Sequence, residues 1–105
     1  MSNHFISVQT AKEYTARFRQ NKDKITTHDY QNALPYSETF DAQAIRDILN
    51  QEGCVGFRTY FGMNENNEVC VIFVGVDDKN EDILTNDIIV EKGKRCPDDC
   101  NYTPL

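Results

Sequence analysis

Hydrophobic positions near the N-terminus recur every three or four residues, which is the spacing of one helix face. Ser7 stands directly before this run and is a good N-cap residue, while Thr10 and Glu13 also fit a capping box. The pattern predicts a helix from about Val8 to Gln20. Its apolar residues, expected in the core, are Val8, Ala11, Tyr14 and Phe18.

A second helical stripe follows a polar connector that contains Pro35. Asp41 is a suitable N-cap, and Phe40 can contact Ile45 as a hydrophobic staple. Gly53 is expected to end this helix, because glycine adopts the left-handed conformation at helix ends. The apolar stripe consists of Ile45, Ile48 and Leu49.

Residues 54–76 change to a period of two, which predicts two strands around an Asn-rich turn at 64–67. A four-residue loop gives one almost wholly apolar face, which we expect to be the core face. This face collects Val55, Phe57, Thr59, Phe61 and Met63 with Cys70, Ile72, Val74 and Val76. Cys54 and Cys70 then lie on opposite faces.

The other face of this hairpin holds one cation, a valine and aromatic patch, and several glycines. In the expected register Arg58 faces Phe73, and Tyr60 faces Val71. A half-exposed antiparallel sheet normally carries polar residues on its outer face. Either the N-terminal segment or the tail of the same chain covers this apolar surface, or it binds a partner protein or a second copy.

Residues 69–76 contain no polar side chain, as is typical of a central strand, and Asp87 to Gly93 is the expected third strand. The acidic loop between them does not match an EF-hand, because Ile83 occupies the glycine position. We therefore expect a single α+β domain over residues 1–105. Two N-terminal helices pack on a three-stranded antiparallel meander, in the order α-α-β-β-β.

The composition and charge of the chain argue against two classes of function, nucleic-acid binding and membrane binding. The chain is 39% hydrophobic and 27% charged, with a formal net charge of −6 and a pI near 4.7. A protein with this net negative charge is repelled by the phosphate backbone of DNA and RNA, so we expect no nucleic-acid binding. No signal peptide and no apolar run of membrane-spanning length is present, which favours a cytoplasmic protein with no membrane partner.

The four cysteines offer the remaining chemistry. Cys54 and Cys70 cannot both join Cys96 and Cys100 around one zinc ion, because they lie on opposite faces of the expected hairpin. The Cys96–Cys100 pair is therefore a structural staple or two inert thiols, a reversible redox pair, or part of a metal site. His4 and His28 lie in weakly structured segments, and no nucleophile, histidine and carboxylate set is readable. We expect no enzyme and no cofactor.

Three motifs resemble a family of small uncharacterised bacterial proteins of about this length. They are "ILNQEGCVGFRTYFG" from Ile48 to Gly62, "VGVD" from Val74 to Asp77, and "CPDDC" from Cys96 to Cys100. Family members share a GCxG[IF]RxYxG hairpin and a C-terminal CPxxC, in which a second proline is common where this chain has Asp-Asp. The resemblance supports the fold class and implies no activity.

The leading hypothesis is thus a non-enzymatic interaction module. Its contact residues would be Arg58, Tyr60, Val71 and Phe73. The alternative is a thiol redox or metal-responsive protein that works through Cys96 and Cys100.

Overall fold

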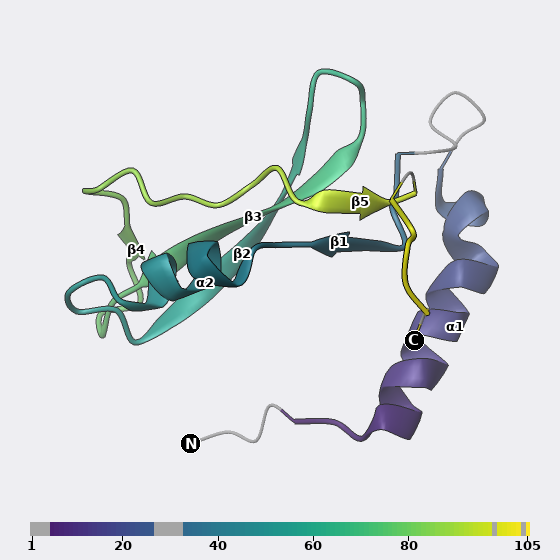
Figure 1. Cartoon of the computed structure of the whole chain (residues 1–105), viewed down its shortest axis with the longest axis horizontal. Helices are drawn as coiled ribbons and strands as arrows, with labels where there is room; N and C mark the ends of the chain where they lie inside the picture. The colour runs from purple at the N-terminus through teal and green to yellow at the C-terminus, as the bar shows by residue number, and fades with distance from the viewer. Residues whose placement is uncertain (1–4, 27–32, 98, 104) are drawn as a thin grey trace.

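The computed structural model of the chain describes residues 5–26, 33–97, 99–103 and 105. It is an α+β fold with two helices and two antiparallel sheets (Figure 1). The elements in chain order are α1 (Val8–Ile25), β1 (Ser37–Thr39), α2 (Ala42–Leu49), β2 (Gly56–Met63), β3 (Val69–Val76), β4 (Asp82–Ile83) and β5 (Lys94–Cys96). One sheet has the strand order β2-β3-β4, and the other pairs β1 with β5. The expected order α-α-β-β-β omitted β1, which lies between the two helices.

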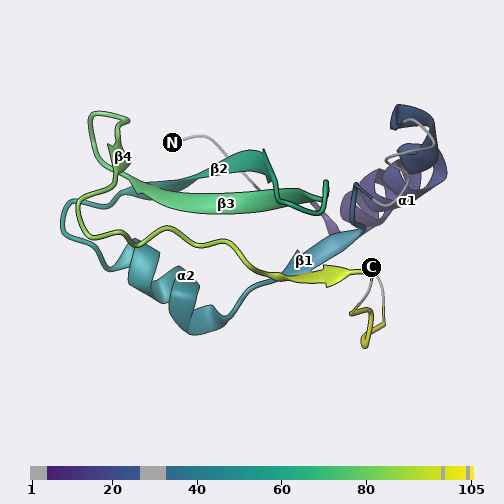
Figure 2. The same cartoon turned by 90° about the horizontal axis from the view of Figure 1, so that it is seen from above.

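Helix α1 begins where the sequence predicts. The Ser7 hydroxyl oxygen accepts a hydrogen bond from the Thr10 N–H at 3.0 Å, so Ser7 is the N-cap. The helix extends to Ile25, beyond the expected end at Gln20, with Lys22 and Lys24 placed favourably in its last turn. Figures 1 and 2 both show α1 at one end of the molecule, apart from the three-stranded sheet.

The expected core role of α1 is wrong for two of its residues. Val8 and Tyr14 are exposed, because the helix does not lie on the sheet. Helix α2 instead packs against β2 and β3. Its residue Ile48 is the most deeply buried large side chain of the described residues, with 1% of its surface exposed.

Asp41 is the N-cap of α2, as expected, although its side chain makes no capping hydrogen bond. The helix ends at Leu49, so the expectation that Gly53 directly terminates it is wrong. Gly53 lies further along the turn that leads into β2, with a φ of +78° that glycine adopts without strain.

The hairpin register differs by one residue from the expected one. Met63 pairs with Val69, so the loop has five residues, 64–68, rather than four. The Asn64 side chain builds this loop by accepting the N–H groups of Asn66 and Glu68, at 2.9 and 3.1 Å. Asn67 adopts a φ of +59°. Because side chains alternate along a strand, this shift turns every β3 side chain to the other face relative to β2.

The third strand of the sheet is β4, and not Asp87 to Gly93. Asp87 and Lys92 both have positive φ values, near +55° and +66°, which interrupts an extended strand. Within this segment Val90 forms an isolated bridge to β3, with hydrogen bonds to Phe73 at 2.8 and 3.0 Å. The chain then continues into β5, which pairs with β1.

Candidate protein interface

The hairpin of β2 and β3 presents two faces of different character. We call the first the arginine face: Gly56, Arg58, Tyr60 and Gly62 from β2 with Cys70, Ile72, Val74 and Val76 from β3. We call the second the aromatic face: Phe57, Thr59, Phe61 and Met63 from β2 with Val69, Val71, Phe73 and Gly75 from β3. The expected contact set is therefore divided, since Arg58 and Tyr60 lie on one face, and Val71 and Phe73 on the other.

On the arginine face a polar cluster spans the sheet. Arg58 forms a salt bridge with Asp82 of β4, and the Tyr60 hydroxyl donates a hydrogen bond to the same carboxylate. The Arg58 guanidinium also donates to the Asn80 side-chain oxygen at 2.7 Å. Because β3 lies between β2 and β4, these side chains pass over Val74, which is only 3% exposed.

This cluster works as a clamp rather than as an acid–base pair. Burial disfavours the charge of Arg58, but the hydrogen bonds to Asp82 and Tyr60 outweigh it and raise the Arg58 pKa above its usual value. The hydrogen bond to Asp82, together with burial, raises the pKa of Tyr60. Both groups therefore stay protonated at neutral pH, and the hydroxyl is no general base.

The aromatic face is only partly covered. Phe73 stacks edge-on against Phe40 and Phe57, with ring centroids 4.7 and 5.4 Å apart. The end of α2 and the turn after it cover the Gly75 end of this face. A Cβ on Gly75 would meet the Ile48 carbonyl oxygen of the helix and the side chains of Gln51 and Cys54.

The part of the aromatic face that β2 contributes is largely exposed to solvent. Phe61 is 79% exposed, and Met63 and Phe57 are also more than half exposed. Val55, which precedes the strand, is exposed as well. The expectation that these β2 side chains form the core is therefore wrong, because the packing of α2 against the sheet leaves each of them more than half exposed. An exposed apolar row of this kind is typical of an interaction surface.

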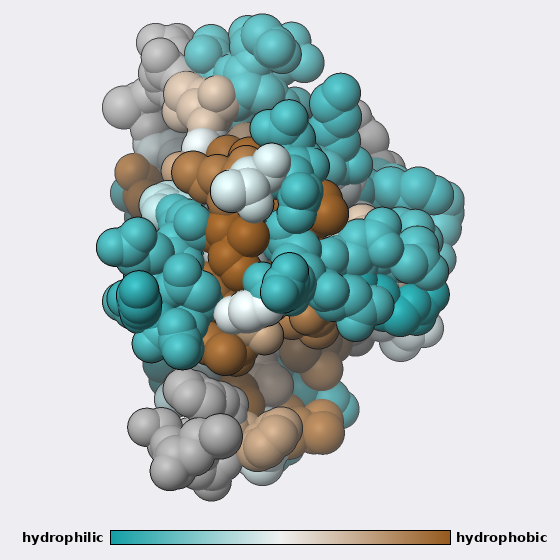
Figure 3. Space-filling view, turned by 90° about the vertical axis from the view of Figure 1, so that its left-hand side faces the viewer, coloured by the Kyte–Doolittle hydropathy of each residue, from teal (hydrophilic) through white to brown (hydrophobic). Residues whose placement is uncertain are grey.

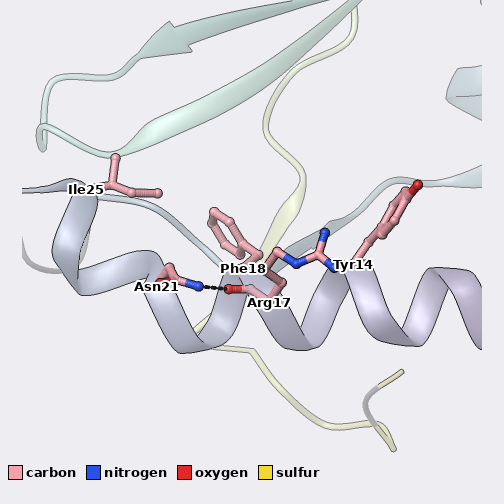
Figure 4. Close-up of a pocket in the computed structure, with 5 residues that line it drawn as sticks. All are labelled: Tyr14, Arg17, Phe18, Asn21 and Ile25. Atoms are coloured by element: carbon pink, nitrogen blue, oxygen red, sulfur yellow. Dashed lines mark hydrogen bonds between the residues drawn. The ribbon is translucent and has the colours of Figure 1, made fainter.

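Apolar surface is also exposed at the end of the molecule that carries β4 and along α1. Seen from the end that carries β4, a hydrophobic band runs between hydrophilic flanks (Figure 3). Along α1, the side chains of Tyr14, Phe18 and Ile25 border a hollow of about 560 Å³ that Arg17 and Asn21 complete (Figure 4).

A half-buried carboxylate, which the sequence pattern did not predict, fills a gap along the other edge of β3. The Glu38 side chain of β1 accepts the Val71 N–H at 3.1 Å, where a neighbouring strand would normally supply a carbonyl. Arg95, its cross-strand partner on β5, donates to the carbonyls of Val69 and Ala33 at 3.2 and 3.0 Å. Burial raises the pKa of Glu38, although the Val71 N–H and the Arg95 charge act in the opposite direction. No periodic signal marks either residue, since β1 and β5 have only three residues each.

The structure joins Cys96 and Cys100 in a disulfide. Cys96 is buried at the end of β5, where its carbonyl accepts the Tyr36 N–H at 2.7 Å, while Cys100 is exposed. Cys54 and Cys70 are free thiols. The Cys54 thiol donates to the Gly56 carbonyl at 3.1 Å. Burial, with nearby Glu91, raises the pKa of Cys70, so this thiol remains protonated and unreactive.

No family model, no curated protein and no solved structure matches this chain.

Among the described residues, no three histidine, cysteine or acidic side chains converge to hold a metal ion. The two histidines, His4 and His28, lie outside the described residues. Within the described ranges, no helix is long and apolar enough to cross a membrane. The family resemblance, the cytoplasmic location and the lack of nucleic-acid binding stay predictions.

Proposed function

We propose that this protein is a non-enzymatic interaction module that binds another protein chain through β2 and the aromatic face. One observation carries the proposal. The chain exposes 8178 Å² of surface, whereas a compact monomer of 12.1 kDa exposes about 6,000 Å². Its radius of gyration is 15.6 Å, against about 13 Å for a compact domain of this length. The surplus is large enough for a standard protein interface, which takes about 800 Å² from each partner.

The kind of side chains that β2 exposes supports the same proposal. Phe57, Phe61 and Met63 place large apolar side chains on one exposed row of β2. Aromatic residues and methionine are enriched in the centres of protein interfaces, whereas lysine and the acidic residues are depleted there. Strand β2 contains no acidic residue and no lysine, although the chain as a whole carries a net charge of −6. The proposed contact region is thus apolar within an otherwise acidic protein.

Photo-crosslinking tests this proposal. The photoreactive amino acid benzoylphenylalanine is placed at position 61, which is 79% exposed, and the chain is irradiated in the cells that produce it. A control carries the same group at position 47, on the exposed side of α2. We expect a discrete protein adduct at position 61 and none at position 47. If neither position yields an adduct, or both yield the same smear, the proposed function is wrong.

A second candidate function rests on the Cys96–Cys100 disulfide. We propose as the alternative that this pair is reduced by an external dithiol, which supplies two electrons and two protons and becomes a disulfide, and is reoxidised by an external disulfide, which takes them up. Cys100 is the exposed residue of the pair, so its sulfur is the expected point of attack. Titration against thiol–disulfide buffers tests this idea. Four free thiols on protein purified without reductant, unchanged by mild oxidant, would eliminate it. A metal-responsive role of the same pair stays a prediction, tested by metal analysis of that sample.

A further inference from the structure

Strand β2 has one free edge. Its even-numbered residues exchange backbone hydrogen bonds with β3, as the register and the Asn64 N–H to Glu68 carbonyl bond at 3.0 Å establish. The backbone groups of the odd-numbered residues, with Thr59 at the centre, therefore point to the other side of the strand. In the described sheet, β3 is the neighbour of β2 on one side and no strand lies on the other.

This edge lacks the features that normally prevent strands from pairing. Natural edge strands are protected by proline, lysine, bulges or short length. Strand β2 runs for eight residues, contains neither proline nor lysine, and pairs with β3 in unbroken register from Gly56 to Met63. By contrast β4, at the opposite edge of the same sheet, has only two residues.

The sequence of β2 is also complementary to itself in antiparallel orientation. If Thr59 lies opposite Thr59 of a second copy, Phe57 lies opposite Phe61 of that copy on the aromatic face. On the arginine face, Arg58 then lies opposite Tyr60 of the second copy. By two-fold symmetry each of these pairs occurs twice, and the two aromatic pairs are of a kind that stabilises neighbouring strands.

We propose that β2 pairs with β2 of a second copy, Thr59 opposite Thr59, so that two chains form one continuous six-stranded sheet. The inference rests on the proposed function and names its partner as this same chain. Two observations favour a second copy over an unrelated protein. The first is the self-complementary register, which a two-fold interface requires of one surface patch. The second is charge: Arg58 is the single charged residue of β2, so the chain's acidic residues stay outside the strand pair.

The apolar side chains of Phe57, Phe61 and Met63 on β2 are among the most exposed of the chain and are available for this pairing. The clamp of Arg58, Tyr60 and Asp82 lies over β3, away from the free edge of β2, and stays intact in the pair.

Cysteine crosslinking tests the register. In the proposed pair the two Cα atoms at position 59 lie about 5.5 Å apart, within the roughly 4.4–6.8 Å that a disulfide spans. The two Cα atoms at position 61 are offset by four residues, about 13 Å along the strand. Both cysteine variants are made in a Cys54→Ser background to remove the partly accessible free thiol. On mild oxidation with diamide, Thr59→Cys is expected to form a covalent dimer and Phe61→Cys is not.

A second pair of variants tests the edge without a crosslink. The Thr59 N–H takes no part in the β2–β3 ladder, so Thr59→Pro removes the donor at the free edge and leaves the hairpin paired. Two hydrogen bonds are lost per dimer, which raises the dissociation constant by about 30-fold. Thr59→Val keeps the N–H and is expected to dimerise like the natural chain. Circular dichroism checks that both variants fold.

The outcomes separate this inference from the proposed function. A dimer of the natural chain with a Thr59→Cys crosslink supports both. An adduct of position 61 with a different protein, together with a monomeric purified chain, supports the proposed function and overturns β2 self-pairing. Equal crosslinking at positions 59 and 61 overturns the register, as does a Thr59→Pro variant that folds and dimerises normally.

Discussion

Replacing Phe61 by alanine distinguishes an isolated chain from a paired one. In a single chain the ring is 79% exposed, so its removal changes the free energy of unfolding by less than about 0.5 kcal/mol, as is usual for surface positions. In the proposed pair each Phe61 lies against Phe57 of the other copy. An aromatic pair contributes about 0.5–1.5 kcal/mol beyond the area that it buries.

Two such pairs form in each dimer, so Phe61→Ala is expected to cost at least 1–3 kcal/mol of association free energy. This corresponds to a roughly 5- to 150-fold higher dissociation constant. Sedimentation equilibrium over a range of protein concentrations measures that constant. Tyr14→Ala is the matched control, since it removes an exposed aromatic side chain from α1 instead of β2. Equal dissociation constants for Phe61→Ala and the natural chain would refute the reasoning.

Three further predictions concern stability. Burial raises the Glu38 pKa, so the folded state is most favoured below the ordinary carboxyl pKa and loses stability as the pH rises through the raised one. Glu38→Gln should therefore raise the melting temperature at pH 7 and leave it unchanged near pH 4, and an equal gain at both pH values would contradict this. Ile48→Ala removes a side chain that is 1% exposed and should cost about 2–5 kcal/mol in urea unfolding. Leu49→Ala on the exposed side should cost under about 1 kcal/mol, and similar values for the two would place Ile48 outside the core. Cys100→Ser opens the short disulfide loop and should cost at most about 2 kcal/mol. Reducing the natural chain should give the same loss, and a much larger loss would mean that the disulfide stabilises the whole fold.

The local elements of this fold are readable from the sequence because they depend on near neighbours. Ser7 and Asp41 mark the starts of the two helices, and residues 54–76 form the expected hairpin. The hairpin register depends on the loop, where one residue decides every side-chain orientation. The sequence pattern of this five-residue loop occurs twice in the chain. Residues 64–68 read NENNE and residues 77–81 read DDKNE, and both form five-residue loops between paired strands.

These two loops are built in the same way. The first side chain, of Asn64 or Asp77, accepts two backbone N–H groups, and the fourth residue, Asn67 or Asn80, has a positive φ. Asparagine adopts this conformation more readily than most residues. Recognising the repeated pattern would have given the five-residue loop, and with it the correct faces of the sheet. The acidic side chain of Asp77 thus has a structural role in its loop.

The burial of the β2 side chains could not be read from their hydrophobicity. Phe57 and Phe61 have the pattern of core residues, and the same pattern is expected of an interface buried between chains. Glu38 was missed for another reason. Its side chain replaces a strand next to Val71, which is a long-range contact that no local period encodes.

The molar mass of the purified natural chain in solution tests self-pairing of β2 most directly. Light scattering coupled to size exclusion, at several loading concentrations, is expected to give twice the 12.1 kDa of the single chain. Thr59→Pro should shift the mass toward that of one chain at loading concentrations where the natural chain and Thr59→Val remain dimeric. A mass of 12.1 kDa for the natural chain at every concentration would contradict the account.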